Sequence, residues 1–356
     1  MIKRGGKVKK FKAYRFPFTW SDISLYRGEL FGVAIISVIF HHYFHLFYNI
    51  EAPNKVIHII SKFYYNAIGS VGVDIFIFLS GFGLYYSLSR KPKLSAYYLK
   101  RIKRVVIPYL LCGLFYWTIR DFIFMHRTFV EFLFDYSLLT FWLTEAFSFW
   151  YISFITILYI ISPFVYWLAN DRRRFVAGVV CSFGLILLCY FFARDVFKNT
   201  EVALQRLPYF LIGMRVGKIA KTPDHDDEQG TSIWFACVLA FSVFLKIIFG
   251  KTNFVLERSF YGYYGIFLIF VYVLVRKKVQ GRWKGLFSLL TLAGKYSLEI
   301  YMLHSFVKNF MVWIGLPIQN PLIYLLHIVI MIPLVYCLAK VLEVLDKVGR
   351  AHTSAI

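Results

Sequence analysis

Long apolar runs are the feature that most constrains this chain. A helix needs about 20 apolar residues to cross a hydrocarbon core about 30 Å thick. Ten segments meet or nearly meet this length, at 29–49, 68–88, 104–120, 147–168, 174–193, 203–220, 232–249, 258–275, 288–310 and 320–342. Hydrophobic residues make up 59% of the chain and charged residues 17%, against roughly 25% charged in soluble proteins. The pattern predicts an all-α, polytopic membrane protein with about ten transmembrane helices.

One stretch between two predicted spans is aromatic but also charged. Residues 122–144 contain His126, Arg127, Glu131 and Asp135. Because charges of this density are costly within a bilayer, we expect this stretch to form an interfacial or partly re-entrant loop rather than a span.

Lys and Arg predict the orientation, because cytoplasmic loops carry an excess of them. With ten spans, both tails and the loops on their side hold 28 of these residues, and the opposite loops hold 10. We therefore expect a multi-pass protein of the cell membrane, plasma or inner, with both termini in the cytoplasm. The expected regions are a basic tail over 1–28, one ten-helix domain over 29–342 and a tail over 343–356. The net charge of +22 then fits contact with anionic membrane lipid rather than nucleic acid.

Three histidines lie close together in the first predicted span, in the segment FHHYFH that contains His41, His42 and His45. Ionisable residues within a membrane are costly and often functional. Metal binding is one interpretation, but imidazoles at this spacing usually need a third protein ligand. The five cysteines lie in apolar runs and show no metal-ligand spacing. A catalytic histidine is therefore favoured over a metal site, and no metal is expected.

Helix counting brings four ionisable residues to a similar depth. At 1.5 Å per residue, His42 lies roughly 22 Å beyond Arg27, in the half of the bilayer away from the cytoplasm. Asp74, Arg206 and His304 reach a similar depth when their own predicted spans are counted in the same way. This agreement favours one site near the outer face. The alternative is that Asp74 and Arg206 merely face lipid headgroups.

A basic cluster marks the cytoplasmic start of the third predicted span. Arg101 and Arg104 are three residues apart and so share a helix face, and Lys100 and Lys103 add to the charge. Guanidinium groups bind phosphate bidentately. On spacing alone, however, a cluster that holds lipid phosphate at the end of a span is the better supported interpretation.

Six segments resemble those of one family, in the same order along most of the chain. They are SLYRGELFGVAIISVIFHHYF at 24–44, GSVGVDIFIFLSGFGLYYSL at 69–88, YYLKRIKRVVIPYL at 97–110, FWYISFITILYIISPF at 149–164, RLPYFLIGMRVGK at 206–218 and YSLEIYMLHSF at 296–306. Together they resemble acyltransferase family 3, the integral membrane O-acyltransferases. The resemblance implies transfer of an acyl group, usually acetyl, from cytoplasmic acyl-CoA to a hydroxyl of an extracytoplasmic carbohydrate or glycolipid.

The resemblance also assigns roles to particular residues. The family's catalytic histidine falls on His42, because the interval from Gly32 to His42 has the family's spacing. Phe31 occupies the place where the family usually has an arginine before that glycine, and Arg27 stands one turn earlier. The resemblance therefore implies that Arg27 joins the donor-binding residues.

The family's RxxR element falls on Arg101 and Arg104, which are then expected to bind the phosphates of acetyl-CoA or another acyl-CoA, together with Lys100. In this reaction His42 acts as general base on the acceptor hydroxyl. An acyl-histidine intermediate is the alternative route.

Other ionisable residues are expected to support this base. We expect Asp74 or Glu299 to orient the imidazole, as the acid does in a catalytic triad. We expect Arg206 or His304 to stabilise the developing oxyanion.

Two other functional classes remain as alternatives. A transporter or flippase for a charged or sugar-linked metabolite would use the same residues as a relay, but such proteins often contain internal repeats and none is visible here. A receptor or scaffold is a third interpretation, although no signalling domain accompanies the spans.

Overall fold

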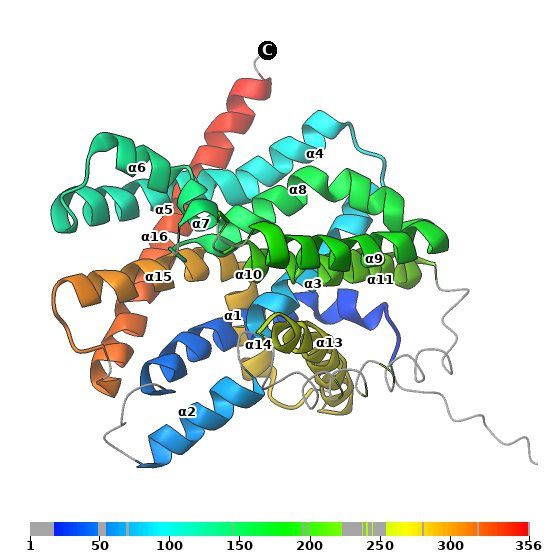
Figure 1. Cartoon of the computed structure of the whole chain (residues 1–356), viewed down its shortest axis with the longest axis horizontal. Coiled ribbons are helices and arrows are strands. Elements are labelled where there is room, and N and C mark those ends of the chain that lie inside the picture. Colours follow the sequence, from blue (N-terminus) through cyan, green and yellow to red (C-terminus); the bar gives the residue numbers. More distant parts are fainter. Residues whose placement is uncertain are drawn as a thin grey trace, which may run out of the picture.

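The fold is seen in a computed structural model of the chain, drawn in Figure 1. It describes residues 18–48, 55–68, 71–144, 146–193, 196–197, 199–222, 237, 240, 244, 254–279, 281–318 and 320–354. Every regular element in these residues is a helix, which confirms the predicted all-α class over this part of the chain. The elements are α1 (Asp22–Tyr48), α2 (Lys55–Ala67), α3 (Val71–Leu88), α4 (Leu94–Arg101), the π-helix η1 (Ile102–Val106), α5 (Ile107–Trp117), the π-helix η2 (Thr118–Phe124), α6 (Phe129–Tyr136), α7 (Leu139–Leu143), α8 (Trp150–Ala169), α9 (Arg172–Leu188), the π-helix η3 (Cys189–Ala193), α10 (Thr200–Leu204), α11 (Leu207–Lys221), α13 (Phe254–Val279), α14 (Lys284–Lys295), α15 (Ser297–Trp313) and α16 (Pro321–Ser354).

Six helical stretches of the described chain are long and apolar enough to cross a membrane. They are Asp22–Phe47, Val71–Leu88, Leu94–Phe124, Trp150–Ala169, Arg172–Phe192 and Pro321–Val348. These stretches coincide with the first five predicted spans and the tenth. The eighth predicted span lies within α13. The seventh, 232–249, falls outside the described residues apart from three single positions.

Two predicted spans are interrupted, which corrects the sequence analysis. Residues 203–220 divide into the end of α10 and the 15-residue helix α11, because Pro208 starts a new helix in its first turn, where its missing N–H is not needed. Residues 288–310 divide into α14 and α15 at Tyr296, whose φ of −102° and ψ of 18° end the first helix.

The charged stretch 122–144 is not a loop but a set of short helices that includes α6 and α7. Its fully buried Asp135 accepts hydrogen bonds from Arg120 at 2.8 Å and from Arg127 at 2.7 Å. Thr128 caps the start of α6 through a reciprocal hydrogen-bond pair with the third residue of the helix. The charges that predicted a loop therefore fold this segment, because Asp135 finds two guanidinium groups locally and Glu131 bonds Thr128 at the start of α6.

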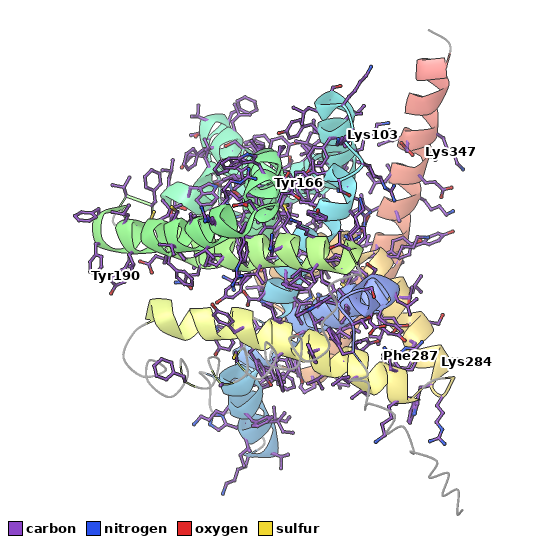
Figure 2. The ribbon with its side chains drawn as sticks, turned by 90° about the vertical axis from the view of Figure 1, so that its right-hand side faces the viewer. Lys103, Tyr166, Tyr190, Lys284, Phe287 and Lys347 are labelled. Carbon is purple, nitrogen blue, oxygen red and sulfur yellow. The ribbon has the colours of Figure 1, made fainter. Side chains whose placement is uncertain are left out.

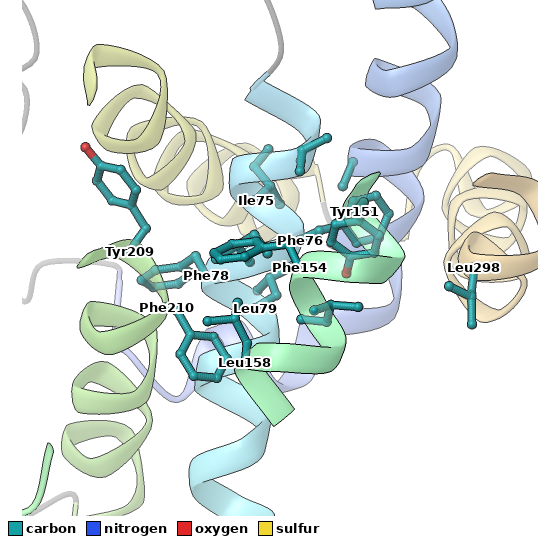
Figure 3. Packing of buried hydrophobic residues seen from close by; sticks show 14 of the residues in the cluster. Ile75, Phe76, Phe78, Leu79, Tyr151, Phe154, Leu158, Tyr209, Phe210 and Leu298 are labelled. Atoms are coloured by element: carbon teal, nitrogen blue, oxygen red, sulfur yellow. The ribbon is translucent and has the colours of Figure 1, made fainter. Parts of the chain in front are cut away.

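Helix α3 is the centre of the packing. It contacts α1, α8, α11 and α13, and most of its side chains are buried. Figure 3 shows the contact region, in which Phe78 and Leu79 of α3 lie beside Leu158 of α8 and Phe210 of α11. Both faces of α3 are thus covered by protein, which explains why it is hydrophobic all round.

Glycines allow two of the helix pairs to approach closely. A Cβ at Gly213 of α11 would overlap the carbonyl of Phe78 on α3, and one at Gly32 of α1 would overlap the carbonyl of Leu290 on α14. Within a bilayer, van der Waals packing of close backbones replaces the hydrophobic drive between helices. These crossings fix the positions of α1 and α3, which carry residues of the site.

Candidate active site

A cavity of about 410 Å³ lies among α1, α3, α8, the α4–η1 segment and the junction of α14 with α15. The described residues that line it include four cations, Arg27, Arg101, Arg104 and Lys295, and no acid. We call this space the arginine cavity. A pocket lined by one sign of charge concentrates counter-ions, so it suits an anionic group.

Arg27 reaches the arginine cavity from α1 because α3 leaves room for it. A Cβ at Gly83 would overlap the guanidinium of Arg27, so any larger residue there displaces the arginine. The same guanidinium lies 5.2 Å from the centre of the Phe31 ring. Its Nε is buried and has no hydrogen-bond partner among the described residues, which leaves a donor available to a ligand.

Arg101 and Arg104 both line the arginine cavity. Arg101 Nη2 donates to Ser87 Oγ at 2.8 Å, and its buried Nε has no partner in the described structure. Arg104 Nη2 donates to the carbonyl of Lys295 at 3.0 Å, so the break between α14 and α15 exposes an acceptor that this arginine uses. The Arg104 side chain is 51% exposed, and it can therefore turn toward a ligand.

A wider cleft of about 1140 Å³ adjoins the arginine cavity, because Arg104 and Lys295 line both spaces. Lys100 and Lys103 lie in this cleft and not in the arginine cavity. Lys103 Nζ is 3.3 Å from Asp346 Oδ1 of α16, and Figure 2 shows it on the side of its helix near α16. The C-terminal half of α16 thus forms one wall of the cleft.

Glu299, which was expected to orient the imidazole of His42, lies next to the arginines, and its orienting role stays a prediction. Its Oε1 is 3.1 Å from Arg104 Nη1, and its side chain is only 3% exposed. Glu299 therefore neutralises one cation beside the cavity.

Asp74 and Arg206 form an ion pair with each other. Asp74 Oδ1 is 3.0 Å from Arg206 Nε, with side-chain exposures of 2% and 4%. The guanidinium also lies 4.9 Å from the Trp150 ring and donates to the carbonyl of Val202. Each charge is therefore compensated by the other, and the expected roles of Asp74 in orienting a base and of Arg206 in stabilising an oxyanion stay predictions.

Histidines from three helices lie side by side. The ring of His42 on α1 is 5.2 Å from that of His304 on α15, which is 4.8 Å from His327 on α16. We call these three residues the histidine cluster. His304 is fully buried, and neither of its ring nitrogens has a hydrogen-bond partner in the described structure. The ring of His41 is 5.7 Å from that of His42.

The sequence analysis missed two residues of this region, His327 and Lys308. Lys308 is half-buried, and its charge acts on His42, His45, His304 and His327. Its spacing of four residues from His304 places both on one face of a helix, and this was the available signal. For His327 there was none, because its contact depends on how α16 folds back.

The arginine cavity and the histidine cluster meet along α15. Tyr301 lines the cavity, and His304 follows one helical turn later. The hydroxyl of Tyr301 accepts a hydrogen bond from the backbone N–H of Tyr151 at 3.3 Å. In the described part of the chain, no group of three or more His, Cys, Asp or Glu residues is placed to hold a metal.

Membrane-length helices around a basic cavity and a histidine cluster define a polytopic helical membrane protein. A family model described as "Acyltransferase domain" matches residues 32–340, from α1 into α16. Because this match spans most of the chain, the protein belongs to acyltransferase family 3 and is a membrane acyltransferase. No curated protein and no solved structure matches the chain.

Proposed function

We propose that this protein is a membrane-bound O-acyltransferase. It moves an acetyl group from cytoplasmic acetyl-CoA to a hydroxyl of a cell-surface or lipid-linked carbohydrate. The observation that carries this proposal is the arginine cavity. Its charged lining residues are all cations, and Tyr301, which also lines it, is one helical turn from His304. Coenzyme A has the matching form, because its phosphates lie at one end and its thioester at the end of a long arm.

The phosphates of the donor bind Arg27, Arg101 and Arg104, since guanidinium groups form bidentate, charge-assisted hydrogen bonds with phosphate. The adjoining cleft at Lys100 is wide enough to receive the nucleotide end. The arm then extends past Tyr301 toward the histidine cluster. Two unpartnered Nε donors, on Arg27 and Arg101, support this placement.

His42 is the general base of the transfer. It takes the proton of the acceptor hydroxyl as the oxygen attacks the thioester carbonyl carbon, and the carbonyl electrons move onto oxygen. When this tetrahedral intermediate collapses, the C–S bond breaks and the proton passes from His42 to the thiolate sulfur. General base catalysis of this kind typically contributes 10²–10⁴-fold to the rate.

Ten spans with both termini in the cytoplasm complete the proposal, with tails over 1–28 and 343–356 around one domain over 29–342. The excess of Lys and Arg in the tails and in the loops on their side supports this orientation. It places the arginine cavity on the cytoplasmic side of the cell membrane and the histidine cluster toward the acceptor.

The test uses the purified full chain in lipid nanodiscs. Acetyl-CoA binding and thiol release are measured for the wild type, the Arg101→Ala/Arg104→Ala variant and Arg174→Ala. Arg174 is a control on α9 that pairs with Asp171. Each charged hydrogen bond contributes about 1.5–3 kcal/mol, so we expect the double variant to bind donor at least tenfold more weakly while the control is unchanged. Equal donor affinity in all three proteins, or no thiol release by the wild type, would contradict the proposal.

A further inference from the structure

The compensated pair of Asp74 and Arg206 leaves a question about the transfer reaction. A tetrahedral oxyanion needs a positive group or hydrogen-bond donors aimed at it, and Arg206 is buried against Asp74. Arg27 does not fill this role, because on α1 it lies roughly 22 Å from His42, and the proposed function assigns Arg101 and Arg104 to the donor phosphates. The oxyanion therefore needs a different cation close to His42.

Lys308 meets this requirement by its position on α15. It is one turn beyond His304 on the same helix face, and the ring of His304 is 5.2 Å from that of His42. Its charge acts on histidines from three helices, among them His42 on α1 and His327 on α16. Its place on the helix face of His304 brings a cation next to the histidine cluster.

The surroundings of Lys308 leave its ammonium group uncompensated. The ion pairs between described residues do not include Lys308. The two carboxylates that the sequence predicts beside His42 are paired elsewhere, Asp74 with Arg206 and Glu299 with Arg104. The residue is half-buried, and a charge in a place of low dielectric acts more strongly than one in water.

We propose that Lys308 is a catalytic residue that stabilises the oxyanion of the acyl-transfer intermediate. This inference rests on the proposed function and assigns the electrostatic role in it. As the acceptor oxygen forms its bond to the thioester carbon, the ammonium of Lys308 faces the carbonyl oxygen that gains the negative charge. The lysine keeps its protons throughout, since His42 accepts the hydroxyl proton and returns it to the departing sulfur.

The experiment measures thiol release from acetyl-CoA by the full chain in nanodiscs, with water and with envelope carbohydrate as acceptors. Removal of one oxyanion-stabilising donor costs about 10²–10³-fold in kcat in a well-studied enzyme. We expect a loss of this order for Lys308→Gln with the KM for acetyl-CoA unchanged, and partial recovery in Lys308→Arg. Lys347→Gln is the matched control, because Lys347 is exposed on α16 and pairs with Glu343.

The outcomes separate the two proposals. Coenzyme A binding checks that Lys308→Gln is folded, because that site lies in the arginine cavity. An active wild type with an equally active Lys308→Gln overturns the role of Lys308 and leaves the proposed function intact. A rise in KM for the carbohydrate without loss of thiol release to water also overturns it, because the lysine then binds the acceptor. A wild type that releases no thiol overturns the proposed function and this role together.

Discussion

The arginine cavity and the histidine cluster share two helices, α1 and α15, yet they use charge in opposite ways. The cavity collects four cations and shares Arg104 with an acidic partner outside it. The cluster contains three imidazoles, which can accept and return a proton during a reaction, and one lysine whose charge acts on them. The difference suggests that fixed charges hold a ligand at one end while exchangeable protons do chemistry at the other.

Replacement of His42 by alanine tests the role of the histidine cluster most directly. We expect kcat for acyl transfer to fall by about 10²–10⁴-fold, because the general base is lost, while the Kd for coenzyme A stays unchanged. The measurement is transfer and donor binding in nanodiscs at matched protein content. His45→Ala is the control, since His45 is exposed at the end of α1. Full activity in the His42 variant, or inactivity in the His45 variant, would remove the distinction between the two ends.

The ion pair of Asp74 and Arg206 belongs neither to the arginine cavity nor to the histidine cluster, so its removal should affect stability rather than activity. Arg206→Ala leaves a buried carboxylate without its partner, which typically costs 3–5 kcal/mol of stability. We expect a clearly lower midpoint of thermal unfolding in detergent, with kcat and donor Kd unchanged per folded molecule. Asp74→Leu/Arg206→Met removes both charges and should be less destabilising than the single variant. A stable Arg206→Ala protein with low kcat would return this arginine to the catalytic site.

Gly83→Ala tests the arginine cavity without removing a charged residue. The added Cβ overlaps the guanidinium of Arg27, so the arginine must leave its place in the cavity. We expect donor Kd to rise about tenfold, since one charge-assisted hydrogen bond contributes about 1.5 kcal/mol, with kcat at saturating donor unchanged. Gly184→Ala on α9 is the matched control, because a Cβ there meets nothing within 4 Å. Donor affinity that is equal in both variants would exclude Arg27 from the donor site.

Glu299→Gln should have the smallest effect on donor binding. It distinguishes two roles of Glu299, which are to neutralise Arg104 beside the cavity or to orient the imidazole of His42. Loss of a negative charge beside Arg104 should tighten donor binding a few-fold at low ionic strength, and salt should reduce the gain. Isothermal titration with coenzyme A at two salt concentrations measures this, and kcat should stay near the wild-type value. A large loss of kcat would instead support the orienting role predicted from the sequence.

The parts of the fold that depend on local composition could be predicted from the sequence. Six spans follow directly from apolar runs, because crossing a bilayer needs a fixed length of helix. The breaks at Tyr296 and before Pro208 could not be predicted, because residues on both sides remain apolar and the hydropathy does not fall.

The candidate site shows the same limit. Arg101 and Arg104 share one turn of chain, so the sequence alone places them together, and both line one cavity. Depth counting brought Asp74 and Arg206 to one level, and they do touch. Counting gives depth but not direction, however, so it did not reveal that they face each other instead of His42. His327 joins the cluster only through tertiary packing and left no local pattern.

Helix α1 has one further consequence for the reaction. It runs without interruption from Arg27 to His42, roughly 22 Å by its rise, and the close crossing at Gly32 holds it against α14. The continuous helix therefore fixes the distance between Arg27 and His42. On the proposed function, this fixed distance selects donors by length. A donor whose phosphates are bound by the arginines but whose arm is too short would not bring its thioester to the imidazole of His42. One residue inserted between Arg27 and His42 would add 1.5 Å and turn the imidazole through about 100°. The distance and the direction of the imidazole can therefore change only together, in steps of one residue.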